Sequence, residues 1–331
     1  MTAGAPTPAA PTRSRRGWWR PVLVVAVLGI AVHVLLPQVD EVRRTFSSLG
    51  DARWWYVPPA AVCAALTFPG AAWSLAGATS RRLPFGSTVE AGLASACLGR
   101  IAPANLGSLG VTGAYLHALG ATVGETTATL GLDAVAGVVV HLVLLAAAGA
   151  LVGRFPHPKL ALPDHLGVVI AVAGGLAVVG LAAGVWWYRR RHGSGWGELV
   201  RRFVTALREG RAEFAGALRS PRRAALLLGG SVLITGAQIA CLGLSVTAFD
   251  GRVDVVTVAF VYLAGAAVSS VSPTPGGLGA MEAALVSGLT LFGVAAGPAV
   301  TGVLLYRVLT FWLPILPGAV AVRRLRRRDL L

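Results

Sequence analysis

Five ionisable side chains of this sequence fall inside long apolar runs, where a charge is costly to bury. They are Arg100, Asp133, His141, Glu282 and Arg307. Charged residues at membrane depth are rare and usually bind a substrate, an ion or one another. A guanidinium matches the geometry of a phosphate, so Arg100 and Arg307 are candidates for holding one. Each arginine also has a plainer interpretation, as a structural ion pair or as a side chain that reaches the membrane interface.

The carboxylates and the histidine leave several roles open. Glu282 is placed to cap the helix that follows a Gly/Pro break, to pair with Arg307, or to receive a proton or a lipid amine. Asp133 and His141 are eight residues apart and therefore share one helix face. For His141, a hydrogen-bonded interior histidine is the better interpretation. The residues that we expect to bind substrate are Arg100, Asp133, Glu282, Tyr306 and Arg307.

Two breaks interrupt the apolar runs, RIAPANLGSLG at 100–110 and SPTPGGLG at 272–279. Proline removes a backbone donor and glycine weakens a helix, so helices are expected to end there. A half-helix that begins after the second break would aim free N–H groups at the membrane interior, which suits a phosphate. The residues that we expect to shape the breaks are Pro103, Asn105, Gly107, Pro273, Pro275, Gly276, Gly277 and Gly279.

The elements that must position these residues are membrane helices. Of the 331 residues, 55% are hydrophobic and only 13% are charged, against about 25% charged in a soluble domain. The composition therefore predicts an all-α polytopic membrane protein with a single transmembrane domain over 18–322. A basic, disordered tail (1–17) precedes it and a basic tail (323–331) follows. A crossing takes about 20 residues, which predicts six full spans at 18–36, 54–79, 126–152, 166–188, 224–249 and 298–322.

The net charge of +15 comes mostly from arginine clusters between apolar runs, a pattern that orients membrane segments. The sequence contains no basic soluble module with aromatic residues, so we expect no nucleic-acid binding. The arginine bias places both termini in the cytoplasm. We expect the protein to lie in the cell membrane. The loop 189–223 carries ten arginines and three glutamates. It predicts either an amphipathic helix on the inner leaflet or an ordinary orienting loop.

In this topology, residues 86–119 enter the membrane from the cytoplasm and return to the cytoplasm. Residues 255–294 enter it from outside and return to the outside. Each stretch is either two full crossings or a re-entrant hairpin, because irregular backbone at membrane depth must be buried or line a cavity. GSLG at 107–110 resembles GGLG at 276–279, an offset of 169. Residues 119–134 resemble 292–307 at an offset of 173, so the alignment needs a gap. Two such units of opposite orientation are typical of an inverted repeat.

Several of these motifs resemble one known family. PTPGGLGAMEAALVSGLTLFGV (273–294) and LLYRVLTFWLPILPGAVAVRRLRRR (304–328) closely resemble the C-terminal signature of the flippase-like family, which includes the transmembrane domain of lysylphosphatidylglycerol synthases. A looser resemblance continues in RIAPANLGSLG (100–110), YLHALG (115–120) and GLDAVAGVVVHLVLL (131–145).

The resemblance implies two re-entrant elements that meet near the middle of the bilayer. It implies site roles for Glu282, Tyr306 and Arg307, with weaker support for Arg100 and Asp133. In this family the partner is a membrane lipid, an anionic phospholipid or a polyprenyl phosphate. The family's synthases carry a soluble transferase domain after the membrane part, which this sequence lacks, so we expect no synthase activity. A homo-oligomer or a synthase partner is left open.

Three functions therefore remain at this point. The first is a lipid flippase or translocator. The second is an accessory subunit or membrane enzyme of polyprenyl-phosphate-linked glycan metabolism, and the third is a small-solute secondary transporter. The sequence contains no P-loop, HExxH or GxSxG motif, so we expect no catalytic residue, metal or cofactor.

Overall fold

The computed structural model describes residues 53–101, 106–152, 216–217, 219–270, 272 and 274–331. Within these ranges every regular element is a helix, which confirms the all-α expectation there. The predictions that lie outside the described residues are the spans 18–36 and 166–188, the tail 1–17, most of the loop 189–223, and the break residues Pro103, Asn105 and Pro273.

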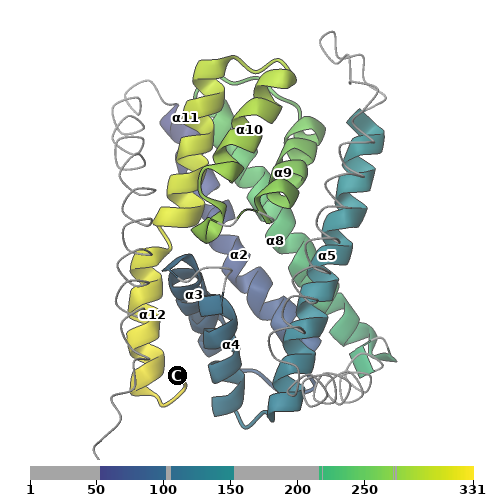
Figure 1. The fold of residues 1–331 in the computed structure, drawn as a ribbon, viewed down its shortest axis with the longest axis vertical. Coiled ribbons are helices and arrows are strands. Elements are labelled where there is room, and N and C mark those ends of the chain that lie inside the picture. The colour runs from purple at the N-terminus through teal and green to yellow at the C-terminus, as the bar shows by residue number, and fades with distance from the viewer. Residues whose placement is uncertain (1–52, 102–105, 153–215, 218, 271, 273) are drawn as a thin grey trace, which may run out of the picture. The chain divides into compact units, whose positions relative to one another are not determined.

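The helices fall into two groups along the chain (Figure 1). The first group is α2 (Val57–Ala78), α3 (Phe85–Ile101), α4 (Leu106–Ala118) and α5 (Val123–Val152), and a short 3₁₀ turn at Trp54–Tyr56 precedes it. The second group is α8 (Pro221–Thr247), α9 (Val255–Ser270), α10 (Ala280–Leu291), α11 (Ala296–Arg307) and α12 (Ile315–Arg327).

Four helical stretches are long and apolar enough to cross a membrane: Trp54–Ala78, Val123–Val152, Pro221–Thr247 and Ala296–Arg327. They coincide with the predicted spans 54–79, 126–152, 224–249 and 298–322. The last is not one regular helix, because a π-helical turn at Val308–Trp312 separates α11 from α12. Such turns re-aim the side chains on either side of them and are frequent at functional sites.

The two interrupted stretches are helical hairpins. Their helices α3, α4, α9 and α10 have 17, 13, 16 and 12 residues, fewer than the roughly 20 that a crossing needs. The first break is shorter than predicted, because Gly107 lies inside α4 and not in the break. A glycine lowers helix propensity by only about 1 kcal/mol, and that is too little to end a helix with packed neighbours.

The two helix groups repeat one local structure. At the α4–α5 junction, the N–H groups of Leu119, Gly120 and Ala121 donate to the carbonyls of Tyr115, His117 and Leu116. At the α10–α11 junction the same three bonds recur 173 residues later, and Gly120 and Gly293 both have positive φ. The structure of these junctions agrees with the offset of 173. Figure 1 shows the two junctions at opposite ends of the described helices.

The offset of 169 is wrong, because GSLG lies within α4 whereas GGLG forms the turn before α10. At an offset of 173 the first residues of α4 and α10 correspond to within one residue, and no gap is needed.

Helices α2 and α8, the first of each group, cross at very short range because glycines face backbone. A Cβ on Gly230 would lie 2.6 Å from the carbonyl oxygen of Gly70, and one on Gly77 would lie 2.6 Å from that of Arg223. Arg223 in turn donates to the carbonyls of Gly77 and Ala78 and so caps the end of α2. Small residues of this kind let membrane helices associate through backbone contact.

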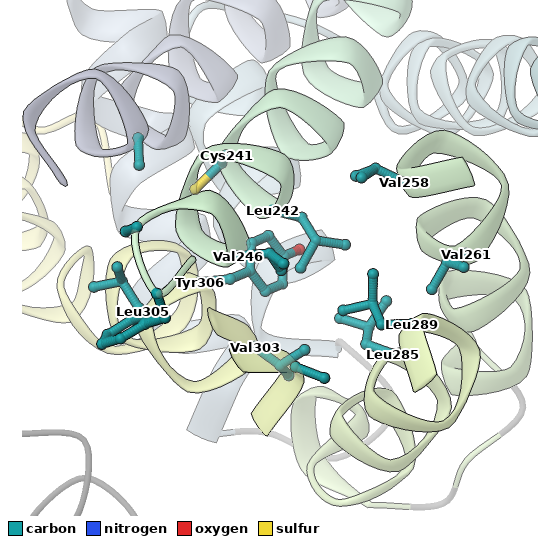
Figure 2. Close-up of a cluster of buried hydrophobic side chains, with 14 of the residues drawn as sticks. Cys241, Leu242, Val246, Val258, Val261, Leu285, Leu289, Val303, Leu305 and Tyr306 are labelled. Carbon is teal, nitrogen blue, oxygen red and sulfur yellow. The ribbon is translucent and has the colours of Figure 1, made fainter. Parts of the chain in front are cut away.

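The largest buried cluster joins α8, α9, α10 and α11. Figure 2 shows Leu242, Val261, Leu285, Leu289 and Val303 pointing toward one another from these helices. All five are almost fully buried. The α9–α10 hairpin is therefore fixed to α8 and α11 by apolar packing.

Helix α12 instead packs on α3. A Cβ on Gly318 would lie 2.6 Å from the Leu93 carbonyl oxygen, and Arg328 donates to Glu90 at 3.2 Å.

The glycine crossing gives a first prediction. Replacing Gly230 by alanine forces α2 and α8 apart and should lower the free energy of unfolding by about 1–3 kcal/mol. Replacing the adjacent Gly229, beside which a Cβ meets nothing within 4 Å, should leave stability unchanged or raise it. Thermal unfolding of the two variants in detergent measures the difference, and equal midpoints would contradict this account of the crossing.

Candidate functional site

The centre of the site is an ion pair between the end of α11 and the start of α10. Arg307 Nε donates to Glu282 Oε1 at 2.5 Å, and the two side chains are only 10% and 14% exposed. A charge pair this well buried must be nearly complete in its hydrogen bonds to be tolerated. The pairing proposed from the sequence is therefore present.

Glu282 also caps its own helix. Its second oxygen, Oε2, accepts from the N–H of Gly279 at 2.7 Å, so the same carboxylate serves both of the structural roles left open by the sequence. This corrects the expectation that the start of α10 offers free N–H groups to an anion. One of these groups is taken, and a carboxylate already lies at the positive end of the helix dipole.

The turn Pro275–Gly277 precedes this cap and depends on its glycines. Gly276 and Gly277 have φ of +63° and +65°, a region that is strained for other residues. A Cβ on Gly276 would also collide with the Phe311 ring. The carbonyl of Gly276 accepts from Arg307 NH2 at 3.4 Å. The predicted break at Gly276, Gly277 and Gly279 is thus confirmed, although α10 begins only at Ala280.

Both arginines lie against one aromatic ring. The guanidinium carbons of Arg307 and Arg100 are 4.6 Å and 5.0 Å from the centre of the Phe311 ring, within the range of a cation–π interaction. Phe311 sits in the π-helical turn. Because the ring contacts both guanidinium groups, two like charges lie close together although α3 and α11 belong to different helix groups.

Arg100 is held by carbonyl groups. Its NH1 donates to Ala96 and its NH2 to Thr310, each at 2.6 Å. Among the residues that the structure describes, no carboxylate lies within ion-pair distance of Arg100. Because Glu282 balances only one of the two arginines, the described residues around Phe311 carry a net positive charge.

A small cavity opens beside this charge, where the turn Pro275–Gly277 contacts α3. Its volume is about 210 Å³, enough for a phosphate group with small substituents. Its described lining combines one guanidinium, two hydroxyls and an aromatic ring. The lining residues are Ser95, Ala96, Gly99, Arg100, Ser108, Gly276 and Phe311.

Tyr306 points away from the arginine pair. Its hydroxyl donates to Gln238 on α8 at 2.9 Å, and its ring packs edge-on against Tyr262 on α9. Figure 2 shows Tyr306 inside the apolar cluster with Leu242 and Val246. The structure thus gives Tyr306 a place in the core beside Arg307.

Asp133 and His141 lie elsewhere. Asp133 accepts a hydrogen bond from Ser74 on α2, and His141 contacts the carbonyl oxygen of Leu263 on α9 at 3.0 Å through Nε2. Of the five residues predicted to bind substrate, the structure therefore brings Arg100, Glu282 and Arg307 together, places Tyr306 beside them in the core, and places Asp133 at a separate helix crossing.

Phe311, Ser95 and Ser108 belong to the site but were not predicted from the sequence. Phe311 is four residues after Arg307, so its spacing in a helix gave a signal that it shares the arginine's face. The two serines could not be predicted as site residues, because serine is common in apolar helices and only the α3–α4 hairpin brings them to the cavity beside Arg100.

A second prediction concerns the ion pair. Glu282→Gln should lower the free energy of unfolding by about 3 kcal/mol, because it leaves Arg307 buried without its counter-charge. Asp250→Asn is the matched control, since its pair with Arg53 has side chains 58% and 63% exposed and should contribute less than about 1 kcal/mol. Unfolding midpoints in detergent compare the two, and equal losses would mean that the pair is not structural.

Two comparisons with known proteins bear on the family of this chain. Residues 21–318 match the family described as the lysylphosphatidylglycerol synthase TM region. A UPF0104 membrane protein of Pyrococcus horikoshii is 28% identical over 130 residues, which are 39% of this chain and 39% of that protein. The aligned part thus spans about two fifths of the length of that curated relative.

The match to the family covers most of the chain, including both hairpins, the Arg307–Glu282 pair and the cavity. It agrees with the four apolar helices long enough to cross a membrane. The chain is a multi-pass membrane protein that belongs to the lysylphosphatidylglycerol synthase TM region family.

Proposed function

We propose that this protein is a lipid translocator that holds the phosphate of an anionic phospholipid or a polyprenyl phosphate where its two hairpins meet. One observation carries the proposal: two guanidinium groups contact the Phe311 ring beside a cavity, and among the described residues only one of the two is paired with a carboxylate. A net positive charge beside a small cavity within an apolar protein favours an anionic ligand.

The proposal includes an inverted repeat of re-entrant hairpins. The helices α3, α4, α9 and α10 are too short to cross, and the recurring junction at an offset of 173 supports two units of one design. With both termini in the cytoplasm, as the arginine distribution indicates, α3–α4 would open inward and α9–α10 outward. A head group between the two tips would then be reached from either leaflet when the hairpins part.

Arg100 is the better candidate for the first contact with the phosphate. A guanidinium has five N–H donors, and the described residues use one on each of its NH1 and NH2 groups, for the carbonyls of Ala96 and Thr310. Ser95 and Ser108 line the same cavity, and the Ser95 hydroxyl lies 3.0 Å from that of Thr112. Both serine hydroxyls would have to turn toward a head group to donate to its phosphate oxygens. Arg307 adds long-range attraction, while Glu282 keeps it in place. The lipid tails would remain in the bilayer.

We propose transport without covalent chemistry. The Glu282 carboxylate is engaged by Arg307 and Gly279, so it is poorly placed to act as a base for Ser95 or Ser108.

Lipid exchange in proteoliposomes tests the function. Fluorescent phosphatidylglycerol should exchange between leaflets faster with the purified protein than in empty vesicles, as measured by quenching of the outer leaflet. Arg100→Ala should slow exchange about tenfold or more, since losing one charged hydrogen bond costs about 1.5–3 kcal/mol. Phe311→Leu, which keeps an apolar side chain but loses the ring, should also slow exchange.

Arg324→Ala is the matched arginine control, because Arg324 is 63% exposed at the end of α12. It should exchange lipid at the wild-type rate. Equal rates in the wild type, Arg100→Ala and Phe311→Leu would discard the proposed site. No acceleration with phosphatidylglycerol or with a polyprenyl phosphate would discard the function.

A further inference from the structure

A second polar cluster lies where α2, α5 and α8 cross, away from the arginine site. Asp133 on α5 accepts a hydrogen bond from the hydroxyl of Ser74 on α2. Ser74 Oγ lies 3.3 Å from Ser231 Oγ on α8, and Ser231 donates to the Leu227 carbonyl at 3.0 Å. Ser74 and Ser231 are 2% and 4% exposed. The apolar side chains of Leu132, Ala136 and Leu227 pack around the same crossing.

This arrangement differs from that of Glu282 in one respect. Glu282 accepts from a guanidinium and a backbone N–H, whereas Asp133 accepts from a hydroxyl. A hydroxyl both donates and accepts, so it suits the charged and the neutral form of an acid. A guanidinium donates only and suits the charged form alone.

The serine pair satisfies both protonation states of Asp133. In the charged state, Ser74 donates to the carboxylate while Ser231 donates to Leu227. In the neutral state, the Asp133 O–H can donate to Ser74, Ser74 can rotate to donate to Ser231, and Ser231 keeps its bond to Leu227. Rotating the Ser74 hydroxyl therefore reverses its bond with Asp133 and adds a bond to Ser231, and both serine hydroxyls keep a hydrogen-bond acceptor in either state.

Other titratable and charged groups on α5 and its packing neighbours are engaged by other partners. Arg223 binds the carbonyls of Gly77 and Ala78, Glu125 binds Arg81, and His141 contacts the Leu263 carbonyl. Tyr115 and His117 on α4 contact Ser87, Thr88 and the Ala121 carbonyl, and Tyr262 on α9 packs on Tyr306. The remaining titratable groups of these helices are Cys63 on α2, and Arg222 and Cys241 on α8.

The repeat relates this cluster to the arginine site. At an offset of 173, Asp133 corresponds to Tyr306 and Ala134 to Arg307. Each of these polar side chains bonds to the first helix of its own group, Asp133 to Ser74 on α2 and Tyr306 to Gln238 on α8. Each group thus has one polar contact between its first helix and the helix that follows its hairpin, which is α5 in the first group and α11 in the second. Of these two contacts, only the one in the first group contains a carboxylic acid.

We propose that Asp133 is the proton-binding residue of this protein, and that Ser74 and Ser231 form the reversible hydrogen-bond chain that serves it. Binding of a proton removes the charge from the α2–α5–α8 crossing, which favours close packing of α5. Release restores the charge and favours a hydrated, looser crossing. Because α5 continues from the α3–α4 hairpin, this step couples a proton to the movement of that hairpin. The coupling rests on the proposed function, whereas proton binding does not.

Infrared spectroscopy of the full chain in lipid nanodiscs tests proton binding without any transport. Acid–base difference spectra of the wild type should contain a protonated-carboxyl C=O band that Asp133→Asn removes. Ser74→Ala should keep the band and shift its frequency, because the carboxyl loses its partner. Asp250→Asn, which changes an exposed carboxylate, should leave that band intact. A wild-type band that survives in Asp133→Asn would overturn the proposal.

Lipid exchange under a proton gradient tests the coupling. The gradient should accelerate exchange by the wild type and by Asp250→Asn, and Asp133→Asn should lose this acceleration. Gradient-dependent exchange that persists in Asp133→Asn would overturn the coupling. An Asp133 band together with an absence of lipid exchange by the wild type would instead overturn the translocator function and leave the proton site standing.

Discussion

The Arg307–Glu282 ion pair is the interaction on which the arrangement of the site depends. It joins the end of α11 to the start of α10, and the same carboxylate caps α10 through Gly279. The turn Pro275–Gly277 is thereby held against Arg307 and Phe311. A buried ion pair is costly in an apolar protein unless its hydrogen bonds are nearly complete. The broken hairpin is therefore fixed at one place, and the cavity beside Arg100 has a defined wall.

The glycine crossing and two side-chain hydrogen bonds hold the helices of the two groups together. The glycine crossing of α2 and α8 brings the first helices of both groups to backbone contact. The hydrogen bonds Asp133–Ser74 and Tyr306–Gln238 then tie α5 to α2 and α11 to α8. Since these polar contacts lie in apolar surroundings, each has few alternative partners.

The two acids have different partners. Glu282 accepts from a guanidinium and a backbone N–H group, which can only donate. Asp133 accepts from the Ser74 hydroxyl, which can also accept. Under the two proposals, a phosphate at the tips and a proton at the crossing would be bound by separate groups, so a change at one need not disturb the other directly.

The sequence by itself determined the helical class, the four spans within the described residues, the positions of both breaks and the identity of the charged residues. These follow from local rules, because apolar length, proline and glycine act within a few residues. It also placed Glu282 and Arg307 together. It misplaced Gly107, because helix continuity there is decided by packing.

Only the tertiary structure decided that Phe311 contacts both arginines, that Ser95 and Ser108 line the cavity beside Arg100, and that Asp133 bonds to Ser74 and lies outside this site. The contacts Ser74–Asp133 and Arg100–Thr310 join residues 59 and 210 positions apart. Such contacts depend on which helices cross, and glycines set the distance at the α2–α8 and α3–α12 crossings. A side chain's own neighbours in the sequence carry no record of that distance.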